Sequence, residues 1–274
     1  MGDRMCDFVI KLTPADLTVR PARTLSEVKN AFKLIYKEYI PLGYCDPNEA
    51  KMHYSPYSLL PTSRTFVLKK KRIFLGTISL IADSPCGLPM ESAFPDIIND
   101  FRRRNKKLAE VSLLTIDRKA FRRKKLELTD HHKLTGSFWL FKAMLDYARH
   151  VAGITDLFIT IHPRHEKLYQ NFAFKPIGEA VAYDYAKGNP GLPMHLDISR
   201  LEEHLPDGKS FRNFFFENKS SAETLTQSYE WSSDILHELL SKKQDSWGEM
   251  SSRFTEYFQT EFLQNLPGTA VNQN

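Results

Sequence analysis

One glutamate inside an apolar stretch is the residue of this sequence best placed for acid–base chemistry. Glu110 stands beside Leu108, Ala109 and Val111, in a segment ending at Ile116 whose composition predicts a β-strand. A lone carboxylate buried there is costly without a purpose, and a positioned carboxylate can take a proton from a substrate. Two structural alternatives stay open: an edge-strand side chain facing solvent, or an ion pair with nearby basic residues.

Other residues that could do chemistry form weaker patterns. His162 and His165 have an i, i+3 spacing, and His131 and His132 are adjacent, but no cysteine or carboxylate cluster completes a zinc site. We therefore predict no bound metal. Cys86 lies between two turn-forming residues with no base beside it in sequence, which favours a small loop thiol over a nucleophile.

Positive charge is concentrated in one segment of the chain. The formal net charge is +5, yet residues 101–125 contain eleven Lys or Arg against Glu110 and Asp117, and residues 201–274 are net acidic. Such a cluster attracts anionic partners over about 8–10 Å, or it is simply a solvated face. No nucleic-acid-binding motif accompanies it, so we expect no nucleic acid partner.

Length and composition indicate an ordinary globular protein. The 274 residues are 42% hydrophobic and 26% charged, and no apolar run approaches the roughly 18–20 residues of a membrane span. The N-terminus lacks the apolar stretch of a secretory signal. Cys6, Cys45 and Cys86 are odd in number and widely spaced, as reduced thiols are. We expect a cytoplasmic location.

The elements that must position Glu110 alternate between helix and strand. The patterns predict helices at Leu25–Ile40 (capped by Ser26), Phe94–Phe101, a segment over Phe138–Ala148 stopped by Gly153, and His165–Asn171. They predict strands at Thr65–Lys70, Ile73–Asp83, Leu108–Ile116, Leu157–Ile161, Pro176–Tyr185 and Met194–Ile198. Residues 41–63 read as a long loop or short helices that form a lid. This order predicts an α/β arrangement on a mixed sheet.

The chain beyond the last predicted strand has a different character. Its apolar residues follow helical spacing at Trp231, Ile235 and Leu239, and again at Phe254 and Tyr257. We therefore expect a domain over residues 1–200 and an acidic helical extension over residues 201–274.

Several motifs resemble those of a known superfamily. The stretch from His162 to Gly178, HPRHEKLYQNFAFKPIG, is similar to the late helix-to-strand motif of the GNAT N-acyltransferases. Three further stretches (residues 76–83, 87–90 and 108–117) resemble the long-chain N-acyl amino acid synthases of bacteria, the FeeM-like group. These are relatives of the acyl-homoserine lactone autoinducer synthases. The resemblance covers roughly residues 25–200.

The resemblance implies a GNAT-like fold, with a mixed, mostly antiparallel sheet and helices on both faces. It implies transfer of a medium or long fatty acyl group to the α-amine of an amino acid. The donor would be an acyl carrier protein thioester or acyl-coenzyme A, with no permanently bound cofactor. Glu110 matches the strand glutamate of these families and would be the general base.

Roles for other residues follow from the same resemblance. Tyr169 would assist the leaving thiolate, although it could equally be a packing aromatic. Backbone N–H groups would stabilise the oxyanion if a bulge leaves them unpaired; they belong to Val111, Ser112, Leu113 and Leu114. Basic side chains would dock the carrier protein or its phosphopantetheine: Arg102, Arg103, Arg104, Arg118, Arg122, Arg123 and Lys124. Tyr36, Tyr44 and Ser79 are our candidates for the acceptor pocket, although aromatic packing under a lid explains the tyrosines equally well.

Two differences between this sequence and the related families narrow the choice of acyl donor and of acceptor. The coenzyme A pyrophosphate turn of GNAT enzymes is glycine-rich, whereas residues 122–137 contain only Gly136, which favours an acyl carrier protein donor. Autoinducer synthases carry arginines where this chain has Ser79 and Leu113. That difference disfavours S-adenosylmethionine and favours an amino acid acceptor.

Two alternatives remain open on the sequence. One is a coenzyme A-dependent acetyltransferase acting on a small amine or a protein. The other is a non-catalytic GNAT-like module that binds a carrier protein or nucleic acid through residues 101–125.

Overall fold

The computed structural model describes residues 17–122, 130–204, 209–216 and 220–241, and single residues near 254–260. Its strands are β1 (Leu17–Pro21), β2 (Arg64–Lys70), β3 (Ile73–Ala82), β4 (Leu108–Ile116), β5 (Asp156–Ile161), β6 (Lys175–Pro176), β7 (Val181–Tyr183) and β8 (Asn189–Asp197). Its α-helices are α2 (Leu25–Tyr39), α3 (Pro95–Arg103), α4 (Asp130–His150), α5 (Glu166–Gln170), α6 (Leu201–His204), α7 (Lys209–Phe216), α8 (Ala222–Thr226) and α9 (Ser233–Ser241).

Short 3₁₀ helices connect these elements. They are η1 (Ile40–Leu42), η2 (Pro56–Leu59), η3 (Pro89–Ser92), η4 (Ala120–Arg122), η6 (Pro163–His165), η7 (Asp184–Ala186) and η8 (Ile198–Arg200). Two of them, η1 and η2, lie in the segment predicted as a lid or loop.

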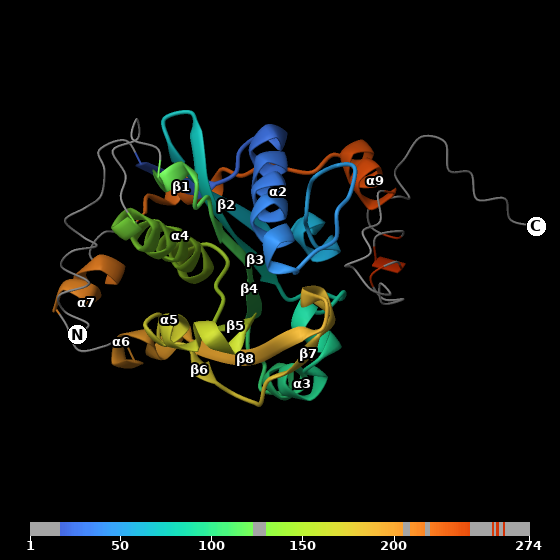
Figure 1. The fold of residues 1–274 in the computed structure, drawn as a ribbon. Helices are drawn as coiled ribbons and strands as arrows, with labels where there is room; N and C mark the ends of the chain where they lie inside the picture. Colours follow the sequence, from blue (N-terminus) through green and yellow to red (C-terminus); the bar gives the residue numbers. More distant parts are fainter. Residues whose placement is uncertain are drawn as a thin grey trace, which may run out of the picture.

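The strands form one sheet in the order β1-β2-β3-β4-β5-β8-β6, and β7 pairs with β8. All the pairs are antiparallel except β4 with β5, which is parallel. Helices cover both faces of the sheet, α2 on one and α4 on the other (Figure 1). The predicted GNAT-like arrangement is therefore confirmed.

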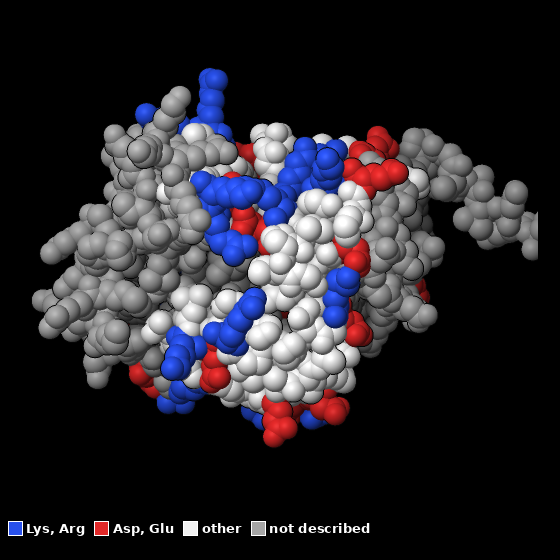
Figure 2. Space-filling view, in the orientation of Figure 1, with Lys and Arg blue, Asp and Glu red and all other residues white. Residues whose placement is uncertain are grey.

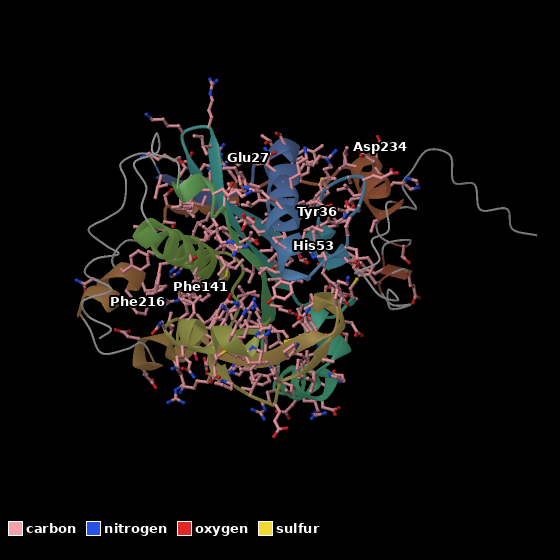
Figure 3. All side chains as sticks on the ribbon, viewed as in Figure 1. Glu27, Tyr36, His53, Phe141, Phe216 and Asp234 are labelled. Carbon is pink, nitrogen blue, oxygen red and sulfur yellow. The ribbon has the colours of Figure 1, made fainter. Side chains whose placement is uncertain are left out.

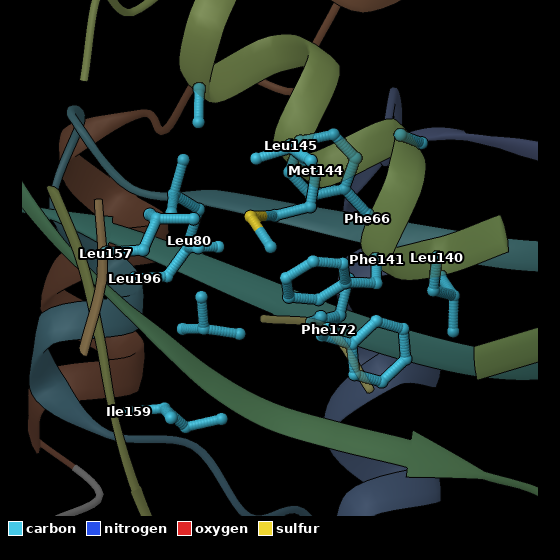
Figure 4. Packing of buried hydrophobic residues seen from close by; sticks show 14 of the residues in the cluster. Phe66, Leu80, Leu140, Phe141, Met144, Leu145, Leu157, Ile159, Phe172 and Leu196 are labelled. Carbon is cyan, nitrogen blue, oxygen red and sulfur yellow. The ribbon is translucent and has the colours of Figure 1, made fainter. Parts of the chain in front are cut away.

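Alternation along the strands builds a hydrophobic cluster on each face. On β2, Phe66 and Leu68 face the cluster that contains α4, and Val67 faces the cluster that contains α2. Figure 4 shows the first cluster, where Phe141 and Met144 of α4 pack with residues of β2, β3, β5 and β8. These two hydrophobic clusters hold the sheet between the helices, and so they fix the position of β4, the strand that carries Glu110.

The centre of the sheet opens. β4 and β5 pair only over Leu108–Glu110 and Asp156–Phe158, although both strands continue beyond that point. From Glu110 onward the two strands run apart (Figure 1). This divergence leaves space between neighbouring strands in the middle of a sheet, where side chains and backbone of both can face a ligand.

A β-bulge interrupts β4 just after Glu110. Ser79 pairs with Ser112 and Thr77 with Thr115, so β4 has one residue more than β3 between the two pairs. Leu113 adopts a positive φ of 56°, a conformation that costs a non-glycine residue about 1–2 kcal/mol. The predicted oxyanion role of residues 111–114 required a bulge there, and the structure contains one.

Several predicted element boundaries need correction. Thr24, not Ser26, caps α2, because the Glu27 backbone N–H donates to Thr24 Oγ1 at 3.2 Å. β1 was not predicted. β8 begins at Asn189 rather than Met194, with Pro190 and Pro193 inside it, and proline is a poor strand signal. The predicted strand over residues 176–185 is two short strands, β6 and β7.

Helices after residue 200 pack on both clusters. Phe214, Phe215 and Leu225 join the cluster around α4. Leu236, Leu239 and Phe254 join the cluster around α2, and the predicted Ile235 packs against it partly buried, so the buried stripe of α9 also includes Leu236. A boundary between two domains at residue 200 stays a prediction.

The described part of the chain contains no helix with the length and apolar character that a bilayer crossing requires.

Candidate functional site

A cavity of about 340 Å³ occupies the space where β4 and β5 diverge. Its walls come from β4, β5, α4, α5, the end of α2, residues 53–55 and the segment from β7 to η7. Aliphatic residues make much of the lining: Leu42, Val111, Leu113, Leu114, Ile116, Ile159, Ile161 and Leu168. Among the described residues that line it there is no Lys or Arg.

Glu110 is buried in the wall of this cavity, at the point where the strands separate. Burial raises the pKa of its carboxyl group to about 8, and the nearby charge of Glu91 raises it further. The backbone N–H of Met90 donates to Glu110 Oε2 at 2.8 Å and partly offsets that effect. A carboxyl group with this pKa exchanges protons near neutral pH.

The loop that supplies this N–H group is fixed by Arg102. Arg102 donates to both carboxylate oxygens of Asp83, at 2.8 and 2.6 Å, and pairs with Glu91. Glu91 Oε1 in turn accepts from the Leu88 backbone N–H at 2.6 Å. Arg102 is thus part of an internal network at residues 83–91 that positions Met90 against Glu110.

The bulge lies next to Glu110 along β4, and Leu113 and Leu114 both line the cavity. In the described chain neither residue has a register partner in β3 or in β5. Backbone groups released from strand pairing in this way are suited to hydrogen-bond a ligand.

Tyr169 of α5 reaches the same cavity from the opposite side of the divergence. Burial raises the pKa of its hydroxyl, and the neighbouring Tyr39 raises it further. Tyr169 therefore stays protonated over the physiological range and can donate a hydrogen bond. Glu110, the bulge and Tyr169 surround one space.

Two tyrosines near Glu110 were not predicted as site residues. Tyr183 and Tyr185 line the cavity. Burial raises the pKa of Tyr183 well above its usual value and that of Tyr185 to about 12, and the charge of Glu110 adds to both shifts. The one sequence signal was the pair of aromatics spaced by two in a predicted strand, which is common in ordinary sheets.

His53 is the second omission. Its ring is buried in the cavity wall and its Nδ1 has no hydrogen-bond partner within the described residues. Burial lowers the pKa of this imidazole to about 4, so the ring is neutral at pH 7. An unpaired buried polar atom at a cavity is a candidate ligand contact. Nothing in sequence distinguished His53 within the lid segment.

The predicted acceptor residues separate into two groups. Tyr44 lines the cavity, and its hydroxyl accepts from Arg164 Nη2 at 2.7 Å. Tyr36 lies outside the cavity on α2, where its hydroxyl accepts from the Asn48 N–H (Figure 3). Ser79 is buried on β3, 3.3 Å from the Thr65 hydroxyl, and also lies outside. The structure brings only Tyr44 to Glu110.

The basic residues predicted to dock a carrier protein do not form one patch. Arg102, Arg103 and Arg104 lie at the end of α3 before β4, whereas Arg118 follows β4. The nine residues of β4, at about 3.3 Å each, place the two groups roughly 30 Å apart. The single cationic rim expected from the sequence is therefore corrected: a strand runs through the middle of the basic segment.

Most of these basic side chains also have acidic partners. Arg103 and Arg104 pair with Asp100, and Arg118 Nε donates to Glu38 Oε2 at 2.7 Å. The Arg122 side chain and residues Arg123 and Lys124 lie outside the described residues. Among all the described residues of the chain, no group of three or more His, Cys, Asp or Glu side chains is arranged to hold a metal ion.

The chain is similar to known acyltransferases. A family model described as N-acyl amino acid synthase FeeM matches residues 30–197. A solved structure of FeeM, an N-acyl amino acid synthase from uncultured soil microbes, is 25% identical. That match covers 69% of this chain and 94% of the other, with a TM-score of 0.59.

Two more solved structures match the chain with lower TM-scores. The autoinducer (AHL) synthase LasI is 10% identical over 75% of this chain and 96% of its own, with a TM-score of 0.48. The spermidine N-acetyltransferase SpeG from Vibrio cholerae is 14% identical over 69% and 98%, with a TM-score of 0.45. No curated protein matches the chain significantly.

Proposed function

Because the chain belongs to the FeeM family of N-acyl amino acid synthases, we propose that it transfers a fatty acyl group from an acyl carrier protein thioester to the α-amine of an amino acid. The acyltransferase assignment comes with the family. The donor, the acceptor and the roles of individual residues are our proposal.

The observation that carries the proposal is the buried Glu110 at the cavity between β4 and β5. An α-ammonium group has a pKa of about 7.7–8.0 and must lose a proton before it can attack. Glu110, with its pKa raised to about 8, is matched to that group and can accept the proton near neutral pH. A carboxylate with an ordinary pKa would be a far weaker base.

The amine nitrogen then attacks the thioester carbonyl carbon, and a C–N bond forms while the carbonyl oxygen gains negative charge. Backbone N–H groups at the bulge around Leu113 stabilise that oxyanion. The C–S bond breaks as the second proton leaves the nitrogen, and this proton ends on the thiolate. The Tyr169 hydroxyl donates a hydrogen bond to the departing sulfur. No covalent acyl-enzyme is required.

The aliphatic lining of the cavity supports an apolar acyl group as the transferred unit. Residues of both diverging strands, including Val111 and Ile159, contribute to it. Burial of each methylene of an acyl chain stabilises the complex by about 0.8 kcal/mol. The sequence of residues 122–137 supports an acyl carrier protein as the donor, because it lacks the glycine-rich turn that binds the coenzyme A pyrophosphate in GNAT enzymes. Part of this segment lies outside the described residues.

The test is acyl transfer by the purified protein. Acyl carrier protein loaded with a long acyl chain is incubated with the twenty amino acids, and N-acyl products are identified by mass spectrometry. Glu110→Gln should lower kcat/KM by about 10²-fold or more, and Tyr169→Phe should lower kcat with little change in KM. Glu179→Gln, at an exposed position, is the matched control and should retain full activity.

Two results would contradict the proposal. The same rate for Glu110→Gln and the wild type would remove Glu110 as base. Acetyl transfer from coenzyme A with no reaction of long-chain thioesters would favour the acetyltransferase alternative.

A further inference from the structure

A second basic surface lies on the exposed side of α2. A groove there is lined by Lys33, Tyr36, Lys37, Ile40, Ala50 and Lys51. Three of these residues are lysines and the other three supply mainly apolar surface. No acidic residue belongs to the described lining of this groove.

The groove lies next to residues that line the cavity. Ile40 lines the groove, and its neighbours Tyr39 and Leu42 line the cavity. Leu42 is also one of the exposed large hydrophobic residues of the described chain. A protein seated on the groove would therefore lie close to the wall of the cavity that contains Glu110.

Basic residues after β4 extend this surface. Lys37 Nζ donates to Asp117 Oδ2 at 2.9 Å and Arg118 Nε to Glu38 Oε2 at 2.7 Å, which attaches the end of β4 to α2. Lys119 follows and is exposed. Figure 2 shows Lys and Arg side chains gathered on this face, over the region of α2 in Figure 1.

This surface is positive because its basic side chains are more exposed than the carboxylates they pair with. The carboxylates of Glu38 and Asp117 are only 10% and 13% exposed, whereas Lys37 and Arg118 are 40% and 53% exposed. The cations face solvent and their acids lie beneath them. On α3 the acid shares the surface, because Asp100, the partner of Arg103 and Arg104, is itself 40% exposed.

We propose that Lys33, Lys37, Lys51, Arg118 and Lys119, the α2 surface, dock the acidic carrier protein that presents the acyl thioester. This inference rests on the proposed function, whose donor it locates. Negative charge on a carrier would meet the exposed lysines, and apolar residues of the carrier would meet Tyr36, Ile40 and Ala50. The thioester arm would then enter past Leu42.

A nucleic acid is the competing anionic ligand. Its binding would not require a position beside a catalytic cavity, and the apolar floor of the groove favours a protein. The carrier protein is therefore the occupant that these observations favour.

Charge reversal of two exposed lysines tests the α2 surface. Lys33→Glu with Lys51→Glu changes two groove residues that have no described carboxylate partner. KM for acyl carrier protein should rise about tenfold or more, and KM for coenzyme A bearing the same acyl chain should stay within about twofold. The effect should shrink at high ionic strength.

Arg103→Glu with Arg104→Glu is the matched control, since it reverses two exposed charges of the α3 group. It should leave KM for acyl carrier protein within about twofold of the wild type, and both double variants should melt like the wild type. An unchanged KM in the α2 variant would overturn the proposal, as would equal rises for both donors or an equal effect of the α3 variant.

Direct binding keeps the docking test independent of turnover. Fluorescence anisotropy of labelled carrier protein should show weaker binding by the α2 variant even if the protein transfers no acyl group. Absence of turnover with intact, Lys33- and Lys51-dependent binding would refute the proposed function alone. Loss of binding to a labelled RNA or DNA oligonucleotide, with carrier binding unchanged, would assign the surface to nucleic acid and overturn the docking proposal.

Discussion

Glu110 carries a desolvation cost at the position where β4 and β5 separate. Its carboxylate is desolvated and accepts a hydrogen bond from the Met90 backbone N–H. A charged group in that position is held less favourably than in water. The same desolvation that suits Glu110 to the base role proposed above must therefore weaken the fold when the group ionises.

This cost gives a pH-dependent prediction. Burial raises the pKa of Glu110 to about 8, while an unfolded glutamate titrates near pH 4.3. Between these values the folded state binds one more proton than the unfolded state, so this group lowers stability as pH rises. Glu110→Gln should raise the melting temperature clearly at pH 8.5 and much less at pH 5.

Thermal denaturation across that pH range makes the comparison, with Glu179→Gln as the exposed control whose difference from the wild type should not depend on pH. Parallel curves for Glu110→Gln and the wild type would show that the Glu110 pKa is not raised in the folded protein.

Among site residues, the sequence predicted those whose position follows from strand and helix order. Glu110 and Tyr169 are fixed by β4 and α5, whose patterns were clear, and the structure brings both to one cavity. Their chemical roles stay predictions. His53 and Tyr185 reach the cavity from irregular segments, where periodicity carries no information on direction. Tyr36 was misplaced for a different reason. Helix α2 was predicted, but the sequence did not show which face of the helix meets the cavity.

At the scale of elements, the loop between β3 and α3 depends on Arg102. This guanidinium pairs with Asp83 and Glu91, which raise its pKa well above the usual value, and all three side chains are partly buried. Arg102→Ala leaves two carboxylates without their partner.

We expect Arg102→Ala to lower the free energy of unfolding by about 2–3 kcal/mol. Arg103→Ala, one residue along on the exposed side, should change it by less than about 0.5 kcal/mol. Urea denaturation measures both. Equal effects of the two variants would contradict the network.

Helix α9 supports the cavity wall from outside the segment that the FeeM family model matches. The Tyr54 hydroxyl donates to the Leu239 carbonyl at 2.8 Å, and Tyr54 lines the cavity next to His53. Leu236 is buried in the same cluster. Leu225 is equally buried, but in the cluster around α4. These two leucines of the C-terminal segment form a matched pair.

Leu236→Ala and Leu225→Ala should each destabilise the protein by about 2–5 kcal/mol, because each leaves a cavity in a core. Only Leu236→Ala should also raise KM for the amino acid acceptor, since it loosens the wall that contains Tyr54. Steady-state kinetics at a temperature where both variants stay folded separates the effects. An equal KM change in Leu225→Ala would count against a local role for α9.

The fold was predictable in outline from local patterns. Helix α2 and strands β2 to β5 appeared with boundaries within a few residues. Two predictions of strands failed. The start of β8 was missed because prolines lie inside it, and β1 was missed because it is short. In both cases pairing with a neighbouring strand decides the structure, and a single segment of sequence does not reveal its partner.

At the scale of the whole molecule, the largest revision concerns charge. Residues 101–125 read as one cationic patch, but β4 passes through the core and carries the two basic groups to opposite ends of the sheet. Proximity in sequence implied proximity in space only while the segment was thought to stay on the surface. The exposed positive face on α2 combines residues from 33 to 119, which no local window contains.

The short pairing of β4 with β5 also has a mechanical consequence. In the described sheet, β4 and β5 are in register over three residue pairs, fewer than the strands on either side of them share, so this seam should open more readily than its neighbours. A thioester lodged in the seam would tie the halves together. When a non-hydrolysable donor analogue binds, amide hydrogen exchange should then slow in both strands together, in Val111–Leu114 of β4 and in Ile159–Ile161 of β5.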